Sequence, residues 1–164
     1  MRKEFLKLLP VETERLIIKK TTIDDINLIL KMDKQEETQK FLGGIKNKSK
    51  DERILFLENA SDSYTVFLKN GSPIGFINLK FEDDFARLSY IFNYDYCNNG
   101  YCTEACLKLI DICFDILNLK SIVADTVDGN NSSKRVLEKL GFKYENFIIK
   151  DSVKFLNYII CKDK

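Results

Sequence analysis

The sequence predicts one domain of the α+β class, with a mixed and mostly antiparallel central sheet flanked by helices. Two helix-like segments near the N-terminal end precede three β-rich runs that turn residues separate. The chain then alternates strand-like and helix-like segments and closes with two strand-like runs. A meander followed by helical crossovers is typical of a mixed sheet. The length of 164 residues suits one hydrophobic core, so we expect residues 1–164 to form a single domain.

One strand and two helices are predicted in the first sixty residues. Residues 13–20 are the first strand. Thr22 and Asp25 have the spacing of a capping box, and isoleucine and leucine follow them at helical intervals. Ser49 and Glu52 repeat this spacing. Both helix starts are therefore marked by side chains that bind free backbone N–H groups.

Three strands follow as a meander. Residues 64–68 and 74–81 are separated by Asn-Gly-Ser-Pro at 70–73, a strong hairpin signal, and acidic residues at 82–84 form the next turn. The third strand covers residues 86–93, and its side chains alternate between two faces. One face receives Ala86, Leu88, Tyr90 and Phe92, and the other receives Arg87, Ser89 and Ile91.

The second half alternates helices and strands. Residues 101–117 form the most regular helical pattern, in which the polar stripe is Glu104, Lys108, Asp111 and Asp115. A strand at 121–125 and a helix at 131–140 follow, and Gly141 with Phe142 stops that helix. Residues 142–149 and 153–161 are predicted as a closing antiparallel pair.

Composition argues against several classes of function. The 26 lysines and arginines against 25 acidic residues leave a formal charge of +1, without the basic excess of nucleic-acid binders. No apolar run approaches the roughly 18 residues of a membrane span, and no secretory leader pattern is present. Five cysteines, an odd number, suit reduced thiols and a cytoplasmic protein. The lack of histidine excludes a Ser-His-Asp triad.

Three cysteines suggest a metal site at first sight. Four residues separate Cys97 from Cys102 and three separate Cys102 from Cys106, which is not zinc-ribbon spacing. Cys102, Cys106 and Cys113 fall on the apolar side of a predicted helix, where cysteine behaves as a small hydrophobic residue. We therefore expect no metal.

Residues 90–105 combine a strand end, a polar turn with Gly100 and an immediate helix start. A helix start exposes unpaired N–H groups and the positive end of the helix dipole, which suits a phosphate or diphosphate. Gly100 permits close backbone approach and a left-handed conformation. An ordinary strand–turn–helix connection is the alternative interpretation of this glycine.

A second motif lies at residues 128–142. Asn130, Ser133 and Arg135 have N-x-x-S-x-R spacing just before a helix that ends in Gly-Phe. Asn130 or Asp128 is also a candidate helix cap, although a cap alone does not explain the whole pattern.

Together these motifs resemble the GNAT N-acetyltransferases, in the branch related to ribosomal-protein N-terminal acetyltransferases. The resemblance covers nearly the whole chain, from TERL at residues 13–16 through residues 73–76 to the motifs at 100–105 and 130–142. It implies a GNAT-like fold and acetyl-coenzyme A as cosubstrate. It also implies a diphosphate loop at Cys97, Asn98, Asn99, Gly100, Tyr101 and Cys102, with Thr103 just inside the helix.

The resemblance assigns roles to the remaining candidates. Ile91 and Phe92 would pair by their backbone with the pantetheine arm of coenzyme A, and an amide there would stabilise the oxyanion. Asn130 would hydrogen-bond the pantetheine, and Ser133 would protonate the departing thiolate. Arg135 would contact a coenzyme phosphate or lie on the surface.

The chain departs from the family pattern at four positions. Cys97 and Cys102 replace the residues that usually open and close the diphosphate loop. Arg87 replaces the glutamate base of many relatives, and Leu137 replaces the tyrosine acid of other branches. A protonated amine must lose a proton before it attacks, and the sequence does not select among the carboxylates at 82–83 and elsewhere. The sequence therefore assigns no general base.

Two classes of function remain from the sequence. The leading hypothesis is transfer of acetyl from acetyl-coenzyme A to a primary amine, on a small molecule or a protein N-terminus, by direct attack in a ternary complex. Arg87 and Cys97 motivate the alternative, a non-catalytic GNAT-fold module that binds coenzyme A or a protein partner. The acceptor and the choice between monomer and homodimer stay open.

Overall fold

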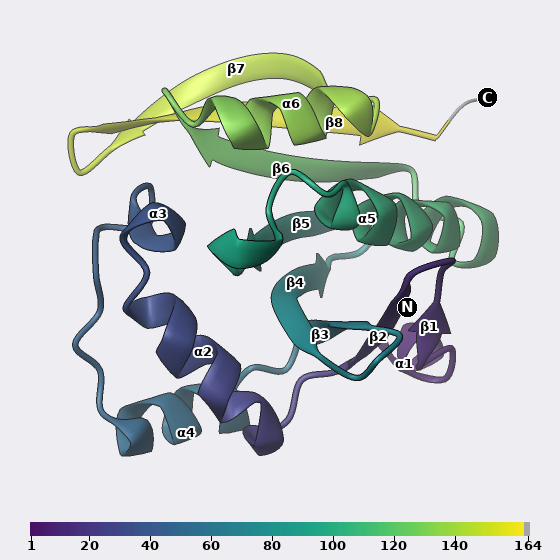
Figure 1. Ribbon diagram of the computed structural model, residues 1–164. Helices are drawn as coiled ribbons and strands as arrows, with labels where there is room; N and C mark the ends of the chain where they lie inside the picture. The colour runs from purple at the N-terminus through teal and green to yellow at the C-terminus, as the bar shows by residue number, and fades with distance from the viewer. Residues whose placement is uncertain (163–164) are drawn as a thin grey trace.

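Eight strands form one sheet in the computed structural model, which describes residues 1–162 (Figure 1). The spatial order is β1-β2-β3-β4-β5-β6-β8-β7, and every neighbouring pair is antiparallel except β5–β6. This confirms the predicted mixed, mostly antiparallel sheet of an α+β protein. The strands are β1 Val11–Glu12, β2 Leu16–Lys20, β3 Ser63–Leu68, β4 Pro73–Phe81, β5 Phe85–Phe92, β6 Ser121–Val127, β7 Lys143–Lys150 and β8 Val153–Cys161.

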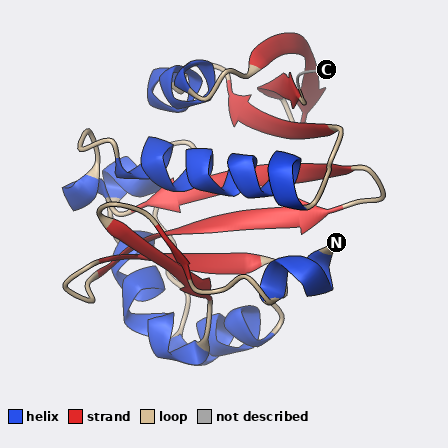
Figure 2. Cartoon of the chain, turned by 90° about the vertical axis from the view of Figure 1, so that its right-hand side faces the viewer, coloured by secondary structure: helices blue, strands red, loops and turns tan. Residues whose placement is uncertain are grey.

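Helices cover both faces of the sheet (Figure 2). On β4, Phe76 packs with α2 and α4, whereas its neighbour Ile77 belongs to the larger core beneath α5 and α6. Successive strand residues point to opposite faces, so the two helix groups form separate layers. No helix of residues 1–162 is long and apolar enough to cross a membrane. The helices are α1 Arg2–Leu6, α2 Ile26–Asp33, α3 Glu36–Gln39, α4 Lys50–Glu58, α5 Tyr101–Asp111 and α6 Asn131–Lys139, with short helical turns η1 Ile23–Asp25, η2 Tyr94–Tyr96 and η3 Ile112–Ile116.

The local signals in the sequence are confirmed. Both capping boxes form: the Thr22 N–H lies 2.9 Å from Asp25 Oδ2, and the Ser49 N–H lies 2.8 Å from Glu52 Oε2. Gly141 ends α6 in the left-handed conformation, with φ of 86°. These signals act between residues close in sequence, so tertiary packing does not override them.

Two predicted elements have an end that differs from the structure by more than two residues. The strand predicted at 13–20 begins only at Leu16, because Thr13 and Leu16 close a turn with an N–H···O distance of 3.0 Å. The helix predicted at 101–117 leaves α-geometry after Asp111, and residues 112–116 form a π-turn that the Leu117 N–H closes onto Ile112. The apolar pattern continues through both segments and does not reveal the change in hydrogen bonding. Elements α1, α3 and β1 are too short for periodicity to predict.

Gly75 allows β4 and the end of β5 to approach closely. A Cβ at this position would lie 2.7 Å from Cγ of Phe92 and 2.8 Å from the carbonyl oxygen of Ile91. We expect Gly75→Ala to lower the free energy of unfolding by about 2 kcal/mol, because sheet backbone must move. In Gly71→Ala, where the new Cβ meets nothing within 4 Å, only left-handed strain of about 1 kcal/mol is expected. Urea unfolding compares the variants, and equal losses would contradict this steric explanation.

Candidate functional site

Strands β5 and β6 are paired over only three residues. Residues 85–87 face residues 121–123, whereas β4 and β8 hold the outer edges of both strands to their ends. Residues 88–92 and 124–127 therefore face each other without a strand ladder between them, and we call this the β5–β6 split. Backbone N–H and C=O groups along the split are available to a ligand that runs like an additional strand.

The predicted loop at the head of α5 leaves backbone donors free. Gly100 caps the helix with φ of 78°, and Asn98 also has a positive φ of 62°. Among residues 1–162, the N–H groups of positions 98–103 have no acceptor in the protein, while the Gly100 carbonyl accepts from the Glu104 N–H at 2.9 Å. Free N–H groups at a helix N-terminus are suited to bind an anion.

The turn before β2 is attached to this helix by the Glu104 carboxylate. Thr13 Oγ1 donates to Glu104 Oε1 at 2.5 Å, and the Arg15 backbone N–H donates to the same atom at 3.0 Å. Arg15 Nε donates to Glu104 Oε2 at 2.6 Å. Partial burial raises the pKa of Glu104, but the hydrogen bonds from Thr13 and Arg15 outweigh it and leave the pKa below its ordinary value. Both carboxylate oxygens of Glu104 therefore accept hydrogen bonds from the turn at residues 13–15.

Asn130 and Ser133 lie together at the start of α6. Asn130 Oδ1 caps the helix by accepting from the Ser133 N–H at 3.2 Å, which confirms the predicted capping role of Asn130. Asp128 instead forms ion pairs with lysines at 134 and 154. Arg135 is exposed, and Leu137 is buried in the main core. Within the N-x-x-S-x-R motif, this hydrogen bond joins Asn130 to Ser133.

Tyr90, which the sequence placed on the same strand face as Ala86 and Leu88, lies beside Ser133. Its hydroxyl is 3.0 Å from Ser133 Oγ and donates to the Ser133 carbonyl at 3.3 Å. Burial raises the pKa of Tyr90, so the phenol stays protonated at neutral pH. The alternation of β5 predicted which face Tyr90 occupies, but only the packing of α6 against the sheet reveals its partner.

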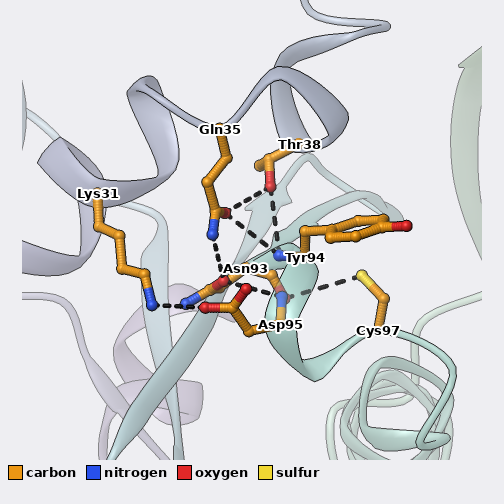
Figure 3. A network of polar contacts seen from close by, with 7 residues as sticks. All are labelled: Lys31, Gln35, Thr38, Asn93, Tyr94, Asp95 and Cys97. Atoms are coloured by element: carbon orange, nitrogen blue, oxygen red, sulfur yellow. Dashed lines mark hydrogen bonds and ion pairs between the residues drawn. The ribbon is translucent and has the colours of Figure 1, made fainter.

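A polar network joins α2 and α3 to the end of β5 (Figure 3). Asn93 is buried, and its Oδ1 accepts from Gln35 Nε2 at 2.8 Å and from the Asp95 N–H at 3.1 Å. The Tyr94 N–H lies 3.3 Å from Gln35 Oε1, and Lys31 pairs with Asp95 at 2.6 Å. This network fixes the path of the chain between β5 and the loop at residues 97–103.

The thiols around the loop are protonated at neutral pH. Burial, with a smaller effect of nearby Asp95, raises the pKa of Cys97. Burial and then a hydrogen bond with Cys106 raise the pKa of Cys102. Among residues 1–162, no three cysteine or acidic side chains gather as a metal site. Thiolate chemistry is therefore disfavoured at these cysteines.

Arg87 lies on the face of β5 opposite α5 and α6. Its Nη1 is 3.1 Å from Oδ1 of Asp125 on β6, and both side chains line a hollow of about 580 Å³ next to the β7–β8 hairpin. Because a guanidinium offers hydrogen-bond donors and no acceptor, Arg87 does not act as a base. Sequence reasoning did not single out Asp125, since only the β5–β6 register brings it beside Arg87.

Residues 15–143 match the family model described as acetyltransferase (GNAT) domain. The chain belongs to the GNAT family of acetyltransferases. The uncharacterized N-acetyltransferase YnaD of Bacillus subtilis strain 168 is 25% identical in an alignment of 146 residues that covers 85% of this chain and 86% of YnaD. As a GNAT protein the chain is an acetyl-coenzyme A-dependent N-acetyltransferase.

Solved GNAT structures share the fold at low identity. A GNAT acetyltransferase from Bacillus anthracis has a TM-score of 0.83 at 22% identity and covers 92% of this chain and 97% of its own. Spermidine N-acetyltransferase from Vibrio cholerae, in complex with CoA and spermine, has a TM-score of 0.78 at 16% identity, with coverage of 92% and 97%. A proposed ribosomal-protein-serine acetyltransferase from Vibrio cholerae has a TM-score of 0.76 at 19% identity, and the match covers 92% of this chain and 96% of the other chain.

The lowered pKa of Glu104 predicts a pH-dependent contribution to the stability of this GNAT enzyme. Such a carboxylate stabilises the fold above its ordinary pKa of 4.5, and the contribution is lost as the pH falls through the lower folded value. We expect Glu104→Gln to cost about 1 kcal/mol at pH 7 and almost nothing once the pH lies below the lowered folded pKa of Glu104. Urea unfolding at both pH values measures the difference, with Glu14→Gln in the same turn as control. A loss independent of pH would contradict the role of the ionised carboxylate.

Proposed function

We propose that this enzyme transfers the acetyl group of acetyl-coenzyme A to a primary amine, on a small molecule or a protein N-terminus, by direct attack in a ternary complex. The observation that carries the proposal is the β5–β6 split next to the free amides at the head of α5. The amide groups of pantetheine suit the unpaired strand edges, and a diphosphate suits the free N–H groups. One elongated cosubstrate thus matches both features.

Individual residues take roles within this site. The loop at 97–102, with Thr103, binds the diphosphate through its amides, and Ile91 and Phe92 pair with the pantetheine arm. Asn130 Oδ1 is used by the helix cap, so its Nδ2 is the atom that donates to a pantetheine carbonyl. Arg135, exposed on α6, is the candidate contact for a coenzyme phosphate.

Protonated side chains near the split support direct attack and proton return to the coenzyme. Cys97 and Cys102 have raised pKa values, so neither is a ready nucleophile for an acyl-enzyme. The Ser133 hydroxyl is the general acid for the departing thiolate, and the protonated phenol of Tyr90 orients it. This arrangement takes the place of the tyrosine acid that Leu137 replaces.

The acceptor enters from the opposite face of the sheet, where Arg87 and Asp125 line the hollow. The two structural neighbours from Vibrio cholerae suggest two classes of acceptor to test, polyamines and ribosomal proteins. The second class corresponds to the branch that the sequence motifs resemble. Five free cysteines favour a cytoplasmic site of action.

Coenzyme A release tests the proposed reaction. A panel of polyamines, small amines and peptides with free N-termini, assayed with acetyl-coenzyme A and a thiol reagent, is expected to give turnover that depends on the amine. Ser133→Ala should lower kcat about 100-fold and leave the KM for acetyl-coenzyme A unchanged, as expected for a general acid. Ser132→Ala, at the exposed neighbouring hydroxyl, is the control. Wild-type rates in Ser133→Ala would exclude the acid role.

Coenzyme A binding tests the loop independently of the acceptor. We expect Gly100→Val to abolish measurable binding, because a β-branched residue is strained at φ of 78° and its Cβ would lie 3.4 Å from Arg15 Nη2. Asn130→Ala should weaken binding about tenfold through loss of one hydrogen bond and the cap. Calorimetric titration measures both. Gly44→Val imposes similar strain at φ of 82° away from the loop, and the same loss in that variant would contradict the assignment.

A further inference from the structure

Arg15 contacts the candidate diphosphate loop from a distant part of the chain. Its Nη1 donates to the Asn99 carbonyl at 3.0 Å, and its guanidinium carbon lies 4.6 Å from the centre of the Tyr101 ring. Its Nε is bound by Glu104 at 2.6 Å. One guanidinium therefore contacts the turn, the first residue of α5 and the first turn of that helix.

The contact with Asn99 determines the direction of the next amide. In a trans peptide the C=O and N–H groups point in opposite directions. Because Arg15 holds the Asn99 oxygen, the Gly100 N–H points away from the guanidinium, and no protein acceptor among residues 1–162 engages it. Gly100 itself has φ of 78°, a conformation in which this orientation is accessible without strain from a Cβ.

We propose that Arg15 is a positioning residue for coenzyme binding: by holding the Asn99 carbonyl, it directs the Gly100 N–H toward the coenzyme diphosphate. This inference rests on the coenzyme site proposed above. Arg15 acts through the peptide and is not itself a ligand of the phosphates.

Glu104 and Thr13 make this contact rigid. Glu104 receives the Arg15 Nε, the Arg15 backbone N–H and the Thr13 hydroxyl, so the guanidinium plane has few alternative orientations. The planar guanidinium of arginine can donate to the carboxylate and to the carbonyl at the same time, because its N–H groups lie at fixed distances from one another. The single ammonium group of lysine cannot do this. Arg15 also balances the Glu104 charge, which would otherwise repel a phosphate at the same helix end.

Coenzyme A and pantetheine distinguish the role of Arg15 from a general structural one. Pantetheine lacks the diphosphate, so a positioning effect at Gly100 should affect only coenzyme A. We expect Arg15→Ala to raise the Kd of coenzyme A about tenfold, with Arg15→Lys in between. The Kd of pantetheine, followed by nuclear magnetic resonance titration, should not change. In the wild type, adding coenzyme A should shift the Gly100 amide resonance, and this shift should shrink in Arg15→Ala.

Two variants sharpen the test. Lys69→Ala removes a neighbouring cation that pairs with Glu12 at 2.5 Å, and it should leave both Kd values unchanged. Glu104→Gln combined with Arg15→Ala removes any repulsion by Glu104 but does not restore the peptide contact, so the tenfold loss should persist.

The outcomes separate this inference from the proposed function. If wild-type protein binds coenzyme A and Arg15→Ala binds it equally well, the positioning role is overturned and the enzyme assignment stands. Equal losses for coenzyme A and pantetheine, or recovery of affinity in the double variant, also overturn the positioning role. A wild-type protein without affinity for coenzyme A overturns both.

Discussion

The early end of the β5–β6 pair is the constraint on which the functional architecture depends. Each strand is held on its outer side, β5 by β4 and β6 by β8, so the two inner edges stay apart after three paired residues. Unpaired backbone groups are costly when water is excluded, and a cosubstrate with its own amides can satisfy them. The neighbouring strands thus leave the proposed binding edge open within the sheet while the rest of the sheet remains continuous.

Two segments that are distant in sequence contact the connection between the end of β5 and the start of α5. The Gln35–Asn93 contact fixes the end of β5 from the side of α2 and α3, and the Arg15–Glu104 pair fixes the start of α5 from the turn before β2. The connection between these points is short and contains the left-handed Gly100. Backbone donors can bind a diphosphate strongly only if they are oriented before the ligand arrives. Holding the connection from both sides supplies that preorganisation.

Sequence reasoning succeeded where the physical cause is local. The Ser49–Glu52 capping box and the Gly141 helix stop act within four residues, and the free amides at Gly100 follow from the start of a helix. It failed where the cause is tertiary. The TERL segment alternates like a strand, yet Thr13 and Arg15 turn toward Glu104, about ninety positions later in the sequence. No pattern within either segment encodes that pairing, and the Tyr90–Ser133 contact is hidden for the same reason.

The coenzyme side of the site could be predicted from the sequence and the proposed acceptor side could not, for a physical reason. The candidate donor site is mainly backbone of one continuous segment, and backbone chemistry can be inferred from a turn and a helix start. The proposed acceptor side gathers Arg87, Asp125, Glu145 and Lys150 from three different strands. Two positive and two negative groups create no dominant field, and the contact of Arg87 with Asp125 cancels part of it. If the acceptor binds there as proposed, charge selects no class of acceptor, and recognition depends on the shape and hydrogen bonding of the assembled hollow.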